Sequence, residues 1–155
     1  DMQLSKNFTL EELCFSQLAK DSGVDNSPDT DDVINNLTLL CEKVLQPVRD
    51  HYGKPVKVNS GYRNETVNVL ARGSNRSDHC HGYAADIEIA SVPNAELAKW
   101  ISNNLEYSQV ILEFYTPGIP DSGWVHVSYT PNLKGQVLTA TRVDSKTVYH
   151  NGLLA

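Results

Sequence analysis

The chain contains 155 residues with a formal net charge of −6, of which 40% are hydrophobic and 21% are charged. These values are typical of a soluble globular protein, and we expect residues 1–155 to form one domain. The acidic balance, without a lysine- or arginine-rich run, excludes nucleic acid as an electrostatic partner. No apolar run reaches the roughly 18 residues that a membrane span needs, and we expect the protein to be a monomer.

The beginning of the chain predicts where the protein is made. Met2 is the only methionine, and Asp1 before it is interpreted as a remnant of cloning. No signal peptide, with its basic start and apolar centre, is visible in the first residues. We therefore expect the protein to be made in the cytoplasm without an export signal of its own.

Two helices are predicted in the first third of the chain. Thr9 and Glu12 form a capping box, with Thr9 as the N-cap of a helix over residues 8–22. Apolar residues at three- and four-residue steps predict a long amphipathic helix over residues 31–51. Pro47 should kink or restart this helix near its end, because proline has no backbone N–H to donate.

The middle of the chain alternates between short strands and helices. An alternating pattern predicts strands at residues 56–60 and 84–89. Residues 64–71 between these strands are predicted to be a short helical or irregular piece, followed by a loop at 73–77. A further helix is predicted over residues 93–104, because a proline stands at its start.

The last third of the chain predicts strands and turns. Residues 109–115 and 124–129 are predicted to be strands that form an antiparallel hairpin. The loop between them, residues 116–123, is rich in proline and glycine. Residues 137–143 and 147–150 are predicted to form a second hairpin.

The three cysteines are Cys14, Cys41 and Cys80, and an odd number at wide spacing does not predict a disulfide framework. Cys14 and Cys41 fall on the apolar faces of predicted helices and are interpreted as small core residues. Cys80 lies between His79 and His81, so it is either a thiolate ligand or a loop cysteine beside a metal. His81 is either a spare ligand or substrate contact, or a loop residue with neither role.

The segment Ser77-Asp-His-Cys-His-Gly-Tyr-Ala-Ala-Asp86 contains the pattern Ser-x-His-x-x-Gly-x-Ala-x-Asp. His79 falls in a loop and Asp86 on the strand that follows, and Gly82 between them allows a sharp turn. His126 lies on a later strand. Two imidazoles and one carboxylate can hold zinc with one coordination position open, which is the arrangement of a catalytic zinc site. We therefore expect one zinc ion per chain.

These motifs are similar to those of the zinc D-Ala-D-Ala carboxypeptidases and the related L-alanyl-D-glutamate endopeptidases, most closely to the small phage-type branch. The resemblance implies that His79, Asp86 and His126 bind zinc. It also implies an α+β fold with a small antiparallel sheet flanked by helices, which this family shares with the hedgehog signalling domain. The similar segments are Phe8-Thr-Leu-Glu-Glu-Leu13, Pro47-Val-Arg49, Ser60-Gly-Tyr-Arg63, Ser77 to Asp86, Leu112-Glu113 and Trp124-Val-His-Val-Ser128.

The resemblance also implies roles for residues around the zinc. Arg63 matches a family arginine that anchors a substrate carboxylate or stabilises a developing oxyanion, with a surface ion pair as the alternative. Ser77 is similar to a family serine that helps to hold the substrate, with a loop-capping hydroxyl as the alternative. Trp124 is interpreted either as a wall of the site that contacts the substrate or as a packing residue.

The sequence leaves two candidates for the general base. Hydrolysis needs a carboxylate that takes a proton from water and passes it to the leaving amine. Many relatives place an acidic residue a few positions before the last zinc histidine, but the third position before His126 is Gly123. Glu113 on the partner strand and Asp121 in the loop remain. We favour Glu113, because a strand fixes a side chain better than a loop rich in proline and glycine.

The leading hypothesis is a zinc-dependent metallopeptidase that hydrolyses peptide bonds in peptidoglycan stem peptides. We expect a phage lysis or tail-associated enzyme that acts on the cell wall, because another phage protein would then give it access without a signal peptide. One alternative is a catalytically silent, zinc-stabilised binding or structural module of a virion, since hedgehog-type relatives keep zinc in a binding domain. Another is a D,D-carboxypeptidase that trims free D-Ala-D-Ala ends.

Overall fold

The computed structural model describes residues 2–75 and 77–155, so that Asp1, and Arg76 in the predicted loop, lie outside the described residues. The strands are β1 (Gln3–Ser5), β2 (Phe8–Thr9), β3 (Lys57–Ser60), β4 (Ala84–Glu88), β5 (Gln109–Glu113), β6 (Trp124–Ser128), β7 (Gln136–Val143) and β8 (Lys146–Asn151). The α-helices are α1 (Leu10–Cys14), α2 (Gln17–Asp21), α3 (Asp31–Leu40), α4 (Gln46–Tyr52), α5 (Glu65–Leu70) and α6 (Asn94–Asn104). A π-helical turn, η1 (Cys41–Leu45), and a 3₁₀ turn, η2 (Asp78–His81), complete the helical segments. None of these helices is long and apolar enough to cross a membrane.

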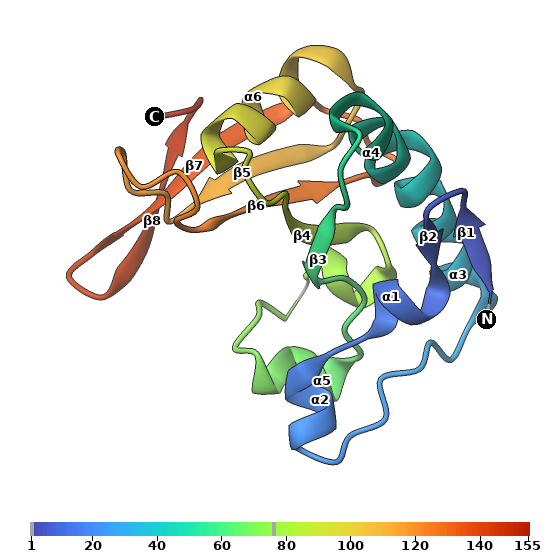
Figure 1. Ribbon diagram of the computed structural model, residues 1–155. Coiled ribbons are helices and arrows are strands. Elements are labelled where there is room, and N and C mark those ends of the chain that lie inside the picture. Colours follow the sequence, from blue (N-terminus) through green and yellow to red (C-terminus); the bar gives the residue numbers. More distant parts are fainter. Residues whose placement is uncertain (1, 76) are drawn as a thin grey trace.

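Within the described ranges, strands β3 to β8 form one six-stranded sheet in the order β3-β4-β6-β5-β7-β8. Neighbouring strands are antiparallel except for β5 and β7, which are parallel. Strands β1 and β2 form a separate small antiparallel sheet (Figure 1). The predicted α+β class is confirmed, and both predicted hairpins, β5-β6 and β7-β8, are present. The parallel pairing of β5 with β7 was not predicted from the sequence, and it makes the larger sheet mixed.

The prediction of one continuous helix over residues 8–22 is wrong, because this segment forms two short helices, α1 and α2. Thr9 is the N-cap of α1, and its Oγ1 accepts a hydrogen bond from Glu12 N at 3.2 Å, as predicted. Phe15 then adopts an extended conformation, and Ser16 Oγ accepts a hydrogen bond from Ala19 N at 3.1 Å. Ser16 starts a new helix because a serine side chain caps a helix better than it continues one.

The long helix predicted over residues 31–51 is interrupted by the π-helical turn η1. The backbone N–H of Gln46 donates to Cys41 O, and α4 begins directly after this wider turn. Pro47 is the second residue of α4 and has no N–H to donate to the preceding turn, which accounts for the interruption at this point. The predicted break is therefore confirmed, and it lies just upstream of the proline. Gly53 ends α4 with a φ of 63°.

The two faces of the larger sheet have different surroundings. One face packs against helices, and α6 lies over β5 and β6 in Figure 1. The opposite face carries alternate residues of the same strands, among them the half-buried Asp86, Glu113 and His126. Burial of the apolar residues on the helix side therefore fixes the strand register, and this register places the polar side chains on the opposite face. The buried residues on the helix side are Ala85, Ile87, Val110, Leu112, Val125 and Val127.

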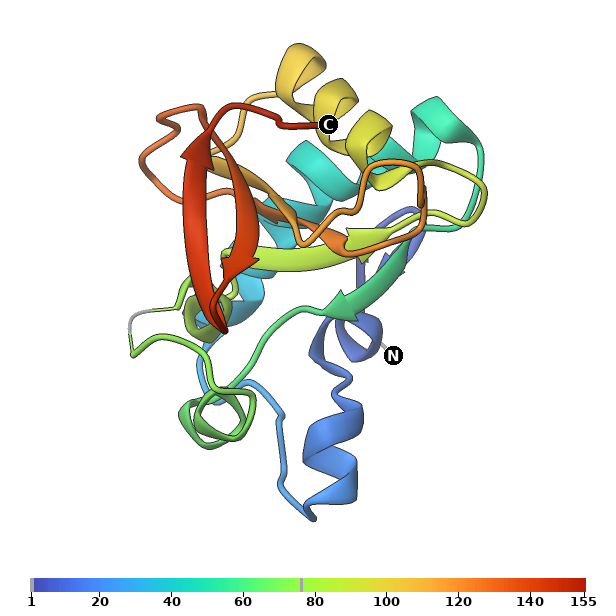
Figure 2. The same ribbon diagram turned by 90° about the vertical axis from the view of Figure 1, so that its left-hand side faces the viewer.

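The β7-β8 hairpin extends the sheet at the edge opposite β3, as the turned view in Figure 2 shows. The register pairs Glu113 with Ala140 across β5 and β7, and Ala140 with Tyr149 across the hairpin. Residues directly opposite each other share a face of a sheet, and so do residues two positions apart on a strand. Tyr149 and Arg142 therefore lie on the same polar face as Glu113.

Candidate metal centre

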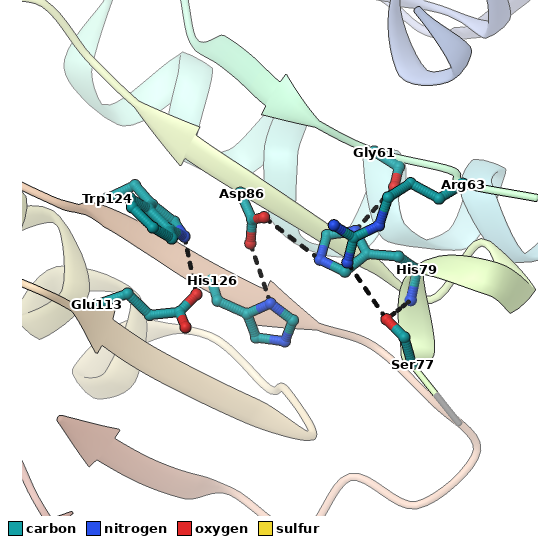
Figure 3. A network of polar contacts seen from close by, with 8 residues as sticks. All are labelled: Gly61, Arg63, Ser77, His79, Asp86, Glu113, Trp124 and His126. Carbon is teal, nitrogen blue, oxygen red and sulfur yellow. Dashed lines mark hydrogen bonds and ion pairs between the residues drawn. The ribbon is translucent and has the colours of Figure 1, made fainter. Parts of the chain in front are cut away.

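Two histidines and one aspartate come together on the polar face of the sheet (Figure 3). Asp86 on β4 lies directly opposite His126 on β6, and His79 comes from η2, just before β4. His126 Nδ1 lies 3.0 Å from Asp86 Oδ1, and His79 Nε2 lies 3.4 Å from Asp86 Oδ2. Among the described residues, these three side chains each offer one possible metal-binding atom within 4.8 Å of the others, and we call them the metal cluster. The structure thus brings together the three residues that the sequence singled out.

The donor atoms of the metal cluster fit a zinc ion. Zinc binds imidazole nitrogen and carboxylate oxygen at about 2.0–2.2 Å in tetrahedral geometry, so adjacent donors lie about 3.3–3.6 Å apart. The separation of His79 Nε2 from Asp86 Oδ2, 3.4 Å, matches this spacing. His126 Nδ1 lies 3.0 Å from the other carboxylate oxygen, Oδ1, and one donor atom from each residue lies within 4.8 Å of the others. Three protein donors leave the fourth position of a tetrahedron for water or substrate.

A backbone carbonyl orients the His79 ring. His79 Nδ1 lies 2.8 Å from Gly61 O, and a carbonyl only accepts, so Nδ1 carries the proton and Nε2, which faces Asp86, is the nitrogen that could bind a metal. Gly61 is itself fixed, because Tyr62 N donates to Leu13 O at 2.8 Å. A side chain at Gly61 would collide with Leu13 O. The glycine is therefore required by the close approach of this segment to the end of α1.

The turn that carries His79 is packed against α3. Asn36 Nδ2 in α3 donates to His81 O at 2.9 Å. Gly82 has a φ of 77°, and a Cβ atom there would lie 2.7 Å from Val33 O. The sharp turn predicted for Gly82 is confirmed, and close packing against α3 is a second reason for glycine at this position.

Asp86 and the two histidines are electrostatically coupled. Burial alone would raise the pKa of Asp86, but the charge of His79 and hydrogen bonds from both imidazoles hold that pKa well below its ordinary value. Burial would lower the pKa of His126, but its hydrogen bond with Asp86 and the charge of Asp86 raise that pKa. Asp86 is therefore an anion here, and it favours either protons or a metal cation on the imidazoles.

The metal cluster lines an open cleft of about 600 Å³. Arg63, Ser77, Glu113 and Trp124 line the same cleft. Arg63 Nη2 donates to Ser77 Oγ at 3.4 Å, and Ser77 Oγ also accepts from His79 N at 3.2 Å, which is the capping contact considered as its alternative role. Among the residues that the structure describes, the buried Arg63 Nε has no hydrogen-bond partner. The guanidinium therefore keeps donors for a ligand in the cleft.

Glu113 brings a second carboxyl group close to the metal cluster. It lies opposite Trp124 on the neighbouring strand, and Trp124 Nε1 donates to Glu113 Oε2 at 2.8 Å (Figure 3). Burial and the charge of Asp86 raise the pKa of Glu113, while His126 and the hydrogen bond from Trp124 oppose this rise. A carboxyl group with a raised pKa is suited to exchange protons closer to neutral pH than an ordinary one.

The structure does not bring Asp121 to this cleft. Asp121 is exposed and lines a separate pocket together with Glu88. Gly123 has a φ of 66°, and a side chain there would collide with Glu113 O. The third position before His126 is therefore occupied by a glycine that this backbone requires. Asp78, which the sequence did not single out, also lines the cleft.

Cys80 and His81 lie next to the metal cluster in sequence but are not part of it. Burial raises the pKa of the Cys80 thiol, against an opposing effect of Arg63, so the thiolate is disfavoured. His81 is exposed, and its ring centroid lies 5.7 Å from that of Tyr83. Neither residue lines the cleft, so the loop interpretation fits both. Cys41 is buried, and Cys14 packs against the core, as predicted.

Phe114, Arg142, Thr147 and Tyr149 are among the other lining residues of the cleft that the sequence did not single out. The predicted strand at 109–115 ends early, because Phe114 has a φ of 56° and breaks the alternation. The Phe114 ring therefore lines the cleft, whereas Tyr115, which unbroken alternation would place on the same face as Glu113, packs against the core. The alternation of side chains along the β7-β8 hairpin could have indicated that Arg142, Thr147 and Tyr149 share one face.

Comparison with known proteins agrees with the geometry. The sequence profile of the family described as peptidase M15 matches residues 6–128, well over half of the chain. This segment includes the whole metal cluster together with Arg63 and Glu113, and it ends before the β7-β8 hairpin. No curated protein matches the chain in sequence. The chain therefore belongs to the peptidase M15 family, whose members are zinc-dependent peptidases of the D-Ala-D-Ala carboxypeptidase type.

Proposed function

We propose that the protein is a zinc metallopeptidase that hydrolyses peptide bonds in peptidoglycan stem peptides. The observation that carries this proposal is a His-Asp-His cluster that shares one cleft with Glu113, a carboxyl group of raised pKa. In the proposal, His79, Asp86 and His126 hold one zinc ion through two nitrogens and one oxygen. When bound, zinc supplies Lewis-acid chemistry, in which a carbonyl is polarised and water becomes a nucleophile at neutral pH.

Glu113 is the proposed general base. Trp124 Nε1 holds Oε2 of this carboxylate, which leaves Oε1 to take a proton from the attacking water. The water oxygen bonds to the carbonyl carbon, and the C–N bond then breaks. Glu113 returns the proton to the leaving amine, so that it starts and ends the cycle ionised. Its place on β5, beside the strand of His126, supports this role because a strand holds the carboxylate rigidly.

Arg63, Ser77 and Trp124 are the proposed substrate-binding residues. The unpaired Nε of Arg63 supports a role in binding a substrate carboxylate or a developing oxyanion through two parallel hydrogen bonds. Ser77 positions the Arg63 guanidinium and offers its hydroxyl to the peptide. Trp124 both orients Glu113 and forms a wall of the cleft.

The proposed setting of this activity is the bacterial cell wall, reached during phage lysis or from a virion. One domain is proposed to carry the activity, since β7 pairs with β5 and joins the last hairpin to the sheet that bears the metal cluster. A monomer suffices, because every proposed ligand and base comes from one chain. The alternative of a catalytically silent virion module loses support from the position of Glu113, which supplies the acid missing at Gly123.

Purified peptidoglycan, digested with the zinc-loaded protein and analysed by mass spectrometry, tests the proposal. An endopeptidase releases fragments cut within the stem peptide, whereas a D,D-carboxypeptidase releases only terminal D-alanine. The Glu113→Gln variant should keep its zinc and release neither product at the wild-type rate. Bound zinc without release of either product would favour the silent module instead.

A further inference from the structure

One arginine of the cleft, Arg142, lies on β7, which β4, β6 and β5 separate in the sheet from β3, the strand that Arg63 follows. Figure 3 shows Arg63 and Ser77 beside His79, with Glu113 and Trp124 on the other side of Asp86. The wall continues beyond Trp124, because the ring centroid of Phe114 lies 5.4 Å from that of Trp124. Arg142 then lies over Phe114, with the guanidinium carbon 4.7 Å from the ring centroid.

The Phe114 ring supports the Arg142 guanidinium through a cation–π contact. A guanidinium over an aromatic ring gains about 0.5–1 kcal/mol at an exposed site, and it keeps its in-plane N–H donors free. Phe114 can do this only because its φ of 56° turns the ring out of the strand alternation. A left-handed conformation is costly for a bulky residue, which suggests that the side chain is needed on the cleft side.

Arg142 keeps its charge available. Within residues 2–75 and 77–155, the ion pairs are those of Asp86 with His79 and with His126, so Arg142 has no acidic partner there. Three arginines and no lysine line the cleft, together with the carboxyl groups of Asp78, Asp86 and Glu113. Arginine binds carboxylates through two parallel hydrogen bonds, which lysine cannot do. The hydroxyls of Thr147 and Tyr149, on the same face of the hairpin, add further hydrogen-bonding groups.

We propose that Arg142 determines substrate specificity by binding a carboxylate on the Glu113 side of the scissile bond. The preferred substrate is then a peptide with free carboxylates on both sides of that bond, one for Arg63 and one for Arg142. Arg142 lies on the β7-β8 hairpin, beyond the residues 6–128 that match the peptidase family. This inference rests on the proposed peptidase function and adds the chemical class of its substrate.

Synthetic stem-peptide fragments test the inference when one carboxyl group at a time is amidated. Arg142→Gln should raise KM for the fully ionised fragment about tenfold, as expected for one Arg–carboxylate contact in a partly exposed cleft, and leave kcat almost unchanged. When the carboxyl group that Arg142 binds is amidated, wild type and Arg142→Gln should have the same KM, because the contact is then absent from both. Arg142→Lys should have a KM between those of wild type and Arg142→Gln, since lysine keeps the charge but not the bidentate hydrogen bonding.

Lys146→Gln is the matched control, because Lys146 is an exposed cation on the same hairpin and does not line the cleft. Equal KM changes in Arg142→Gln and Lys146→Gln, or an equal loss on every fragment, would overturn the inference. If the zinc-loaded wild type cleaves no fragment, the proposed function fails, and the affinities of the same fragments, followed by tryptophan fluorescence, decide the inference separately. A preference for the ionised fragment that disappears in Arg142→Gln supports it, and no preference or no binding refutes it.

Discussion

His126 Nδ1 lies 3.0 Å from Oδ1 of Asp86, its direct partner across β4 and β6. This relationship follows from the register of two central strands, whose other face is buried in the core. A slip by one residue would turn both side chains into the apolar face, so the packing that stabilises the fold also positions Asp86 and His126. The metal cluster is therefore preorganised by the sheet, with η2 adding His79 as its third side chain.

Zinc binding is expected to depend on His79, Asp86 and His126. His126→Ala and Asp86→Asn should bind zinc at least about 100-fold more weakly, because even changes to groups behind the ligands cost 10–100-fold. Titration of the metal-free variants with zinc against a competing chelator measures this loss. His81→Ala is the control, because His81 is exposed and outside the metal cluster. Wild-type affinity in His126→Ala would remove this residue from the ligand set.

Glu113→Gln is expected to lower kcat by about 10²–10⁴-fold, the usual contribution of a general base, with unchanged zinc content. Asp121→Asn should leave kcat unchanged, because Asp121 lies in a different pocket. Asp78→Asn gives a stricter comparison, since Asp78 lines the same cleft. Rates of new amine formation on peptidoglycan fragments compare the three variants. A loss of activity in Asp78→Asn or Asp121→Asn, with Glu113→Gln still active, would move the base to that residue.

The pH profile should report the raised pKa of Glu113. The base acts when ionised, so kcat/KM is expected to be low below this pKa and to increase as pH rises through it. The hydrogen bond from Trp124 lowers the pKa of Glu113, so Trp124→Phe should shift the acidic limb to higher pH. The measurement is made at saturating zinc, so that metal loss does not imitate the effect. A limb that shifts to lower pH in Trp124→Phe would contradict this assignment.

Substitutions at two glycines test how closely the loop at residues 116–123 approaches β5. Gly123 and Gly118 both have positive φ, 66° and 89°, but only at Gly123 would a Cβ atom meet neighbouring backbone. Replacement by alanine strains the backbone at both sites, because φ is positive at each, and at Gly123 it adds the collision. Gly123→Ala should be less stable than Gly118→Ala by about 1–3 kcal/mol in chemical denaturation, as for other overpacked sites. Equal stability would show that the loop has room for a side chain.

The sequence predicted most elements, because short-range patterns determine them, and the family resemblance singled out the three residues that the structure brings together. Thr9 capped the first helix as expected, and the alternation in β4 placed Asp86 on the polar face. The break at Ser16 was missed, since a serine inside an apolar pattern favours either a helix interior or a new cap. The local sequence does not distinguish these two outcomes without tertiary packing.

The features missed in the site depend on contacts between distant segments. The parallel pairing of β5 with β7 brings Arg142 and Tyr149 to the cleft, and no local pattern specifies it. The left-handed conformation of Phe114 is also invisible in sequence, because a bulky residue is among the least expected there. The orientation of His79 depends on the carbonyl of Gly61, a backbone group that any residue carries.

Hydrolysis of peptidoglycan by the metal-free protein, measured as new amino groups while zinc is added back, tests the central claim most directly. The account predicts no release without metal, and a rate that rises with zinc and saturates at one ion per chain. Zinc binding at one ion per chain without any amine release would contradict the peptidase assignment. Full release before zinc is added would contradict the metal centre.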